Sequence, residues 1–122
     1  MLPRSVLIVD DNPDFSGVAA SILREEGYVV DECSDADAAA VRLKITSYDA
    51  IVLEPSPSAG FSSLLKLLSD PKIMSHVVAA TTEDDPDFIG HLNAAGVFCV
   101  LRKPMMTPQK LSASVKACCA GR

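Results

Sequence analysis

The strongest constraint on the fold is the alternation of short apolar runs with segments of helical periodicity. Five such runs occupy residues 5–9, 28–33, 48–54, 76–81 and 97–101. An apolar run of four to eight residues closed by turn residues is typical of a strand buried in a parallel sheet. Strands that alternate with helices predict an α/β fold, with a doubly wound five-stranded parallel sheet covered by helices on both faces.

The segments between the runs carry the start and stop signals of helices. Asn12 and Pro13 are a good N-cap and first helical residue, and Gly27 is a natural terminator. The apolar residues between them follow the spacing of one helix face: Phe15, Val18, Ala19, Ile22 and Leu23. Ser34 with Asp37 resembles a weakened capping box. Further helices are expected from there to about residue 45, over 61–69, after 85–86 and after 107–108, and no linker divides the single domain expected over 1–122.

Composition restricts the class of protein. The chain of 122 residues carries a net charge of −5, which argues against a direct nucleic-acid surface and against binding to anionic membranes. No apolar run approaches the ~18–20 residues of a membrane span, and the first residues do not form a secretory signal. The four cysteines lack C-x-x-C spacing, so reduced thiols in a cytoplasmic protein are expected.

Polar residues stand where four of the expected strands end. They are Asp10, Asp11, Glu54, Thr81 and Lys103. In an open parallel sheet the carboxyl ends of the strands meet on one side, so these groups are expected to share a small pocket. Clustered carboxylates require a cation, and Mg²⁺ prefers oxygen ligands and keeps waters that a phosphate can replace. Lys103 would balance one negative charge, and Thr81 could donate to a phosphoryl oxygen.

Three stretches carry a resemblance to a known family. They are Val-Leu-Ile-Val-Asp-Asp-Asn-Pro at 6–13, Tyr-Asp-Ala-Ile-Val-Leu at 48–53, and Thr81 followed later by Lys103-Pro104. The chain resembles the receiver domain of response regulators in two-component signalling. The resemblance covers nearly the whole chain and implies a flavodoxin-like (βα)5 fold.

The resemblance also implies roles for individual residues. In this family a histidine kinase passes a phosphoryl group to an aspartate, beside an Mg²⁺ ion held by an acidic pair and a loop carbonyl. Asp10 and Asp11 would be the metal-side acids, and the backbone carbonyl of Ser56 would be a further ligand. Thr81 and Lys103 would contact the phosphoryl group. The proline after the lysine implies a cis Lys103–Pro104 bond.

The position of the phosphoacceptor holds Glu54 instead of aspartate. The extra methylene carries the carboxylate ~1.5 Å further, one C–C bond. A misplacement near 1 Å can cost ~10²-fold in a reaction that depends on positioning, as phosphoryl transfer does. We therefore expect an atypical receiver that signals without phosphorylation. Two outcomes are open for Glu54: it pairs with Lys103 and imitates the activated state, or it fills the pocket and obstructs the metal.

Two further positions depart from the family pattern. The aromatic switch residue of the fifth strand is replaced by Val100, and of the usual residues in the loop after Glu54 only Gly60 remains. A receiver that still binds Mg²⁺ and accepts phosphate, at Glu54 or a neighbouring carboxylate, is the main alternative. A small phosphoryl-transfer enzyme of the haloacid-dehalogenase type is disfavoured, because residues 10–13 do not form its Asp-x-Asp motif, so no enzymatic activity is expected.

The resemblance implies protein partners, namely a histidine kinase or a downstream effector. By analogy with the family they would bind the face formed by residues 86–95, 97–101 and 108–119. The formation of a homodimer is left open by the sequence.

Overall fold

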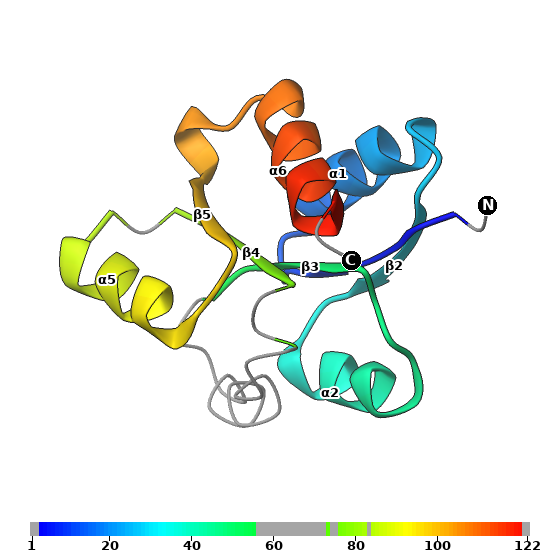
Figure 1. Cartoon of the computed structure of the whole chain (residues 1–122), viewed down its shortest axis with the longest axis horizontal. Helices are drawn as coiled ribbons and strands as arrows, with labels where there is room; N and C mark the ends of the chain where they lie inside the picture. Colours follow the sequence, from blue (N-terminus) through cyan, green and yellow to red (C-terminus); the bar gives the residue numbers. More distant parts are fainter. Residues whose placement is uncertain (1–2, 56–72, 74–75, 83, 121–122) are drawn as a thin grey trace.

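Five parallel strands form one sheet in the order β2-β1-β3-β4-β5 (Figure 1). The computed structural model describes residues 3–55, 73, 76–82 and 84–120. The strands are β1 (Ser5–Val9), β2 (Val29–Cys33), β3 (Ala50–Leu53), β4 (Val77–Thr81) and β5 (Cys99–Arg102). The predicted α/β fold with a five-stranded parallel sheet is confirmed. The fifth strand begins two residues later than the apolar run at 97–101 and ends one residue later.

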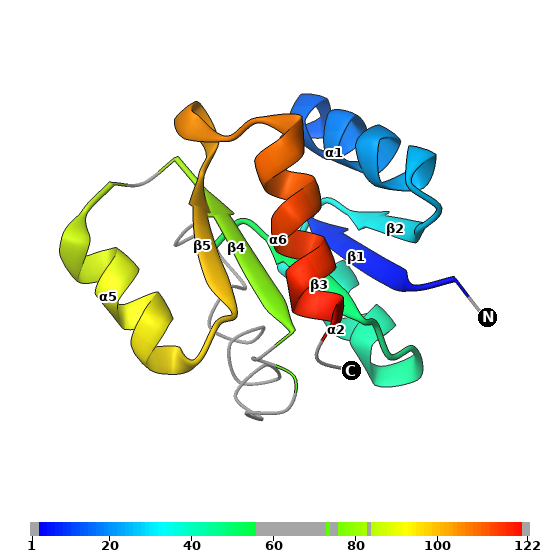
Figure 2. The ribbon, with the colours of Figure 1, turned by 45° about the horizontal axis from the view of Figure 1, so that its top comes forward.

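Helices cover the sheet on both faces. They are α1 (Pro13–Glu25), α2 (Ala36–Ile45), α5 (Pro86–Ala95) and α6 (Pro108–Ala120), and a short 3-10 helix, η1 (Lys103–Met105), follows β5. The views agree that α1 and α6 lie side by side on one face, with α2 on the other (Figures 1 and 2). The helix expected over 61–69 lies outside the described residues. No helix of the described chain is long and apolar enough to cross a membrane.

The alternation of side chains along each strand divides the core into two layers. In β1, Val6 and Ile8 pack under α1 and α6, where Leu23 and Leu111 are fully buried. Leu7 and Val9 belong to the opposite layer, which includes Ala39 of α2. Strands buried on both faces explain why the sequence shows continuous apolar runs instead of an apolar–polar alternation.

The helix starts follow the capping signals, with one correction. The side chain of Asn12 accepts hydrogen bonds from the backbone N–H groups of Asp14 and Phe15 at 3.0 and 3.3 Å, as predicted. The cap of α2 is Asp35, whose Oδ1 accepts from the N–H of Ala38 at 2.8 Å. The capping box predicted at Ser34 was therefore wrong by one residue, because the extended backbone of Asp35 places its carboxylate over the first helical turn.

The predicted buried face of α1 is confirmed at Ala19 and Leu23 but not at Val18. Val18 is 61% exposed, whereas Ser16 and Ala20 are buried. The Ser16 hydroxyl donates to Glu32 Oε1 at 2.7 Å, so its burial leaves no hydroxyl unpaired. The face of α1 that meets the sheet is thus rotated from the stripe of large apolar residues toward the small residues of the helix.

The packing of α1 predicts a clear effect on stability. Replacing Leu23, which is fully buried in the layer between α1 and the sheet, with alanine should lower the free energy of unfolding by about 2–5 kcal/mol. Val41→Ala is the control, since Val41 is 62% exposed on α2 and its loss should change stability by no more than about 0.5 kcal/mol. Chemical denaturation measures both, and equal effects would contradict the layer assignment.

Candidate functional site

A lysine and two carboxylates meet at the carboxyl end of the sheet. The Nζ atom of Lys103 lies 2.8 Å from Asp10 Oδ2 and 3.2 Å from Glu54 Oε2. The side chains of Lys103, Asp10 and Glu54 are 14%, 1% and 11% exposed. Since little water reaches these charges, their attraction is screened far less than that of a surface ion pair.

The sheet ladder sets the distance between the two carboxylates. Val9 of β1 is paired in register with Leu53 of β3, so Asp10 and Glu54 are the next residues on adjacent strands. The backbone N–H of Glu54 donates to the carbonyl of Val9 at 2.9 Å, which continues the ladder beyond the strand ends. Asp10 Oδ1 accepts from the N–H of Asn12 at 2.9 Å. The Asp10 carboxylate is thus held by a backbone N–H, whereas for Glu54 the ladder holds the backbone from which the side chain starts.

Burial and charge act in opposite directions on these groups. Burial raises the pKa of the Glu54 carboxyl, the nearby Lys103 ammonium opposes the rise, and Asp10 and Asp11 add to it. Burial alone would lower the pKa of Lys103, but the carboxylates of Asp10 and Glu54 outweigh that effect and raise it. At neutral pH the lysine is thus held in its charged form.

Of the other predicted site residues, Thr81 and Asp11 lie at the same end of the sheet, and Val100 lies within β5. Thr81 ends β4, is 1% exposed and is aligned with Arg102, the residue before Lys103. Val100 is half-buried in β5, opposite Ala79. Asp11 is exposed and, with Asp10, lines a cleft of about 370 Å³ between the ends of β1 and β2. The convergence predicted from the strand ends is observed for Asp10, Glu54 and Lys103.

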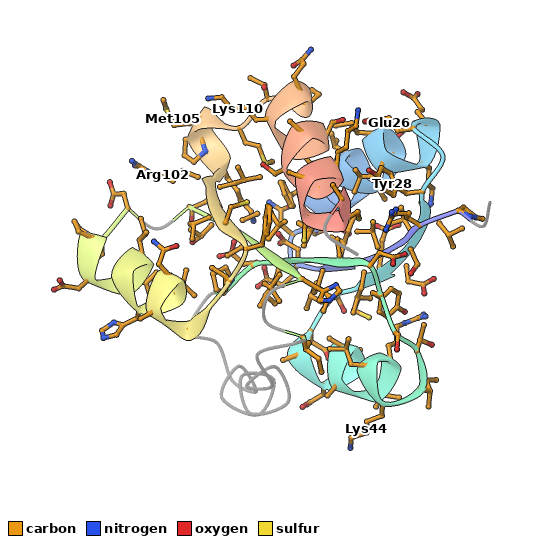
Figure 3. The ribbon with its side chains drawn as sticks, viewed as in Figure 1. Glu26, Tyr28, Lys44, Arg102, Met105 and Lys110 are labelled. Atoms are coloured by element: carbon orange, nitrogen blue, oxygen red, sulfur yellow. The ribbon has the colours of Figure 1, made fainter. Side chains whose placement is uncertain are left out.

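The segment after Lys103 is held by its own hydrogen bonds. The Nζ atom of Lys110 donates to the carbonyl of Met105 at 3.1 Å, and Thr107 Oγ1 accepts from the N–H of Lys110 at 3.1 Å. Figure 3 shows Met105 and Lys110 near the junction of η1 and α6, with Arg102 at the end of β5. With the hydrogen bond that the N–H of Met106 donates to the carbonyl of Lys103 at 3.2 Å, these contacts hold the turn that follows the lysine.

Comparison with known proteins identifies the family. A model of the response regulator receiver domain matches residues 6–116. The chain belongs to this family. Receiver domains of this kind are signalling modules of two-component response regulators and are generally not enzymes.

Individual relatives agree with this assignment. A response regulator receiver protein of Anaeromyxobacter sp. (strain Fw109-5) is 34% identical over 114 residues, which make up 88% of this chain and 46% of that protein. The nitrogen assimilation regulatory protein NtrX of Azorhizobium caulinodans is 40% identical over 53 residues, or 43% of this chain and 12% of that protein. The chain thus spans less than half the length of either curated relative.

Solved structures show the same fold. A two-component response regulator from Clostridium difficile superposes with a TM-score of 0.82 at 26% identity and covers 94% of each chain. The signal receiver domain of a putative Luxo repressor protein from Vibrio parahaemolyticus superposes with a TM-score of 0.87 at 21% identity, over 98% of this chain and 92% of that chain.

Receiver domains typically bind Mg²⁺ at their acidic pocket, so we tested whether the described residues fit the ion. Asp10 Oδ2 and Glu54 Oε2 are buried, and in the described structure the Lys103 ammonium lies against both of them. No three acidic, histidine or cysteine side chains of the described chain converge closely enough to hold a metal. As arranged, Asp10 and Glu54 hold the Lys103 ammonium, so an ion bound by them would compete with that lysine. The predicted ligand Ser56 lies outside the described residues.

At the site of this receiver domain, one sequence prediction was wrong and one contact was not predicted. The Lys103–Pro104 bond is not cis, and no described peptide bond is. Lys103 begins η1, so Pro104 lies in the first turn of this helix. A trans proline fits there, because backbone N–H groups of the first turn have no partner within the helix and proline has none to offer. The missed residue is Phe15, whose ring centroid lies 4.4 Å from Lys103 Nζ. Its position on the apolar stripe of α1 indicated a core residue and gave no sign of a contact with Lys103.

The raised pKa of Glu54 predicts a pH dependence of stability. Near and above pH 4.5, the ordinary value for this carboxyl, the folded state binds more protons at Glu54 than the unfolded state does. Stability contributed by this group must therefore fall as the pH rises through its raised folded pKa. The Glu54→Gln variant lacks this titration, so the native protein should lose stability relative to it over that range. Denaturation curves of the two proteins, recorded from about pH 4 upward, measure the difference in their free energies of unfolding, since about pH 4 lies just below the usual glutamate pKa. A difference that stays constant with pH would contradict the expectation.

Proposed function

We propose that this receiver domain signals without a phosphorylation cycle, because Glu54 is already engaged by Lys103. The observation that carries the proposal is the 3.2 Å separation between Glu54 Oε2 and Lys103 Nζ, in a pocket where Lys103 also meets Asp10 at 2.8 Å. Glu54 stands at the position where the family carries its acceptor aspartate. A phosphoryl group at this residue would require the lysine to leave its partner.

Of the two outcomes left open by the sequence, the pairing of Glu54 with Lys103 is the one that this geometry supports. The longer side chain puts a negative charge close to where a phosphoryl group would lie in a typical receiver. We therefore propose that the domain permanently imitates the activated state of a receiver. Val100 fits the same proposal, because the fifth strand lacks an aromatic ring that could report a change at the pocket.

Magnesium binding is proposed to be weak. An ion would have to draw the carboxylates of Asp10 and Glu54 away from the Lys103 ammonium, and it would add a second cation beside the first. Repulsion between the two cations in a poorly hydrated site opposes this exchange. Asp11, the exposed member of the acidic pair, would remain available to a hydrated ion only at the rim.

We assign protein partners to the face formed by residues 86–95, 97–101 and 108–119, as in related receivers. Receiver domains generally interact with histidine kinases and effectors. Phe98 is 43% exposed and Met105 63% exposed at or beside this face, which provides apolar contact area. We place the domain in the cytoplasm and treat residues 1–122 as one receiver unit that acts through this surface.

Direct phosphorylation tests the proposal. The protein is incubated with acetyl phosphate and Mg²⁺, and its intact mass is measured over time. We expect no stoichiometric gain of a phosphoryl group, since the acceptor carboxylate is misplaced and paired. A full gain of one phosphoryl group would contradict the proposal and favour the alternative, in which Glu54 or a neighbouring carboxylate still accepts phosphate.

Shortening the acceptor tests the cause. Glu54→Asp withdraws the carboxylate by ~1.5 Å, one C–C bond, and should weaken its contact with Lys103. We expect this variant to bind Mg²⁺ more tightly in calorimetry and to gain a phosphoryl group from acetyl phosphate. Glu54→Gln is the matched control, because it keeps the length, removes the charge and should stay unmodified. Unchanged Mg²⁺ affinity in Glu54→Asp would show that Glu54 is not what excludes the ion.

A further inference from the structure

Lys103 has a third neighbour besides its two carboxylates. Its Nζ atom lies over the ring of Phe15, 4.4 Å from the ring centroid. This distance is within the ~6 Å over which the face of an aromatic ring attracts a cation. The ammonium is therefore contacted from three elements: by Asp10 after β1, by Glu54 after β3, and by Phe15 in the first turn of α1.

The position of the Phe15 ring is set by the helix start. The backbone N–H of Phe15 donates to Asn12 Oδ1 at 3.3 Å, and Asn12 is in turn linked through its N–H to Asp10 Oδ1 at 2.9 Å. The cap thus connects the residue that carries the ring to the carboxylate that binds the same lysine. The ring also lines an apolar groove of about 100 Å³ between α1 and α6, together with Val18, Met106 and Leu111.

We propose that Phe15 is a positioning residue that holds the Lys103 ammonium at the carboxylate pair. A lysine side chain is a flexible stem that ends in a point charge, so two carboxylates alone leave its approach direction poorly defined. The ring adds a contact from the α1 side and shields the ammonium, which is 14% exposed as a side chain. Phe15 acts through Lys103, and the inference stands whether or not signalling by this domain requires phosphate.

An alternative role for Phe15 is apolar packing alone. The ring lies among partly buried side chains next to the core, so any large apolar residue could fill its volume. The two roles differ in what they require of the side chain. Packing needs volume, whereas attraction of the ammonium needs the negative face of an aromatic ring. Leucine and tyrosine at this position therefore separate them.

The test uses the side-chain resonances of Lys103 in NMR spectra of the whole chain. In the native protein the Lys103 ammonium should be ordered, with protons that exchange with water slowly enough to be observed. Phe15→Tyr keeps an aromatic face and should retain this ordered signal, whereas Phe15→Leu fills the volume without a ring and should lose it. Phe15→Met, which also lacks a ring, serves in its place if the leucine variant does not fold.

Val18→Ala is the matched control. Val18 lines the same groove on the same helix, is 61% exposed, and does not contact Lys103 through any interaction seen in the described structure. It should leave the Lys103 resonances unchanged. The proposal is overturned if Phe15→Leu or Phe15→Met retains the ordered ammonium signal, as packing alone predicts, or if Val18→Ala removes that signal to the same extent. Because no arm involves phosphate, this result is independent of the acetyl phosphate experiment.

Discussion

The contact on which the functional end of the molecule depends is the ammonium of Lys103 held between Asp10 and Glu54. The two carboxylates are brought together by adjacent strands, and in a poorly hydrated site they would repel each other without a cation. A buried charge that loses its partner is costly, so removal of any one of the three groups affects the other two. In the described structure it is the Lys103 side chain that lies against both carboxylates.

The fold supplies this arrangement without special local structure. The register that pairs Val9 with Leu53 places Asp10 beside Glu54, and β5 brings Lys103 to the same end of the sheet. The apolar layers on both faces keep the strands buried and in register. Stability therefore comes mainly from the aliphatic core, and the charges at the strand ends decide what the domain can bind.

Much of this could be predicted from the sequence, because strand ends in a parallel sheet share one edge. That rule was enough to predict that Asp10, Glu54 and Lys103 lie close together. The sequence also shows directly that residue 54 is a glutamate. The contact between Phe15 and Lys103 could not be predicted, since it depends on the rotation of α1 about its axis. The same rotation leaves Val18 exposed and Ser16 buried. Neither could be predicted, because a stripe of large residues does not show which of its edges meets the sheet.

The ladder hydrogen bond from Glu54 to Val9 has a consequence for how such a domain can change over evolutionary time. Because the backbone fixes where the side chain at this position begins, a substitution there alters reach and charge while the scaffold stays as it is. Codons for glutamate and aspartate differ by one base. A single base change thus exchanges Glu54 for aspartate and shortens the side chain, while the ladder hydrogen bond keeps its starting point in place.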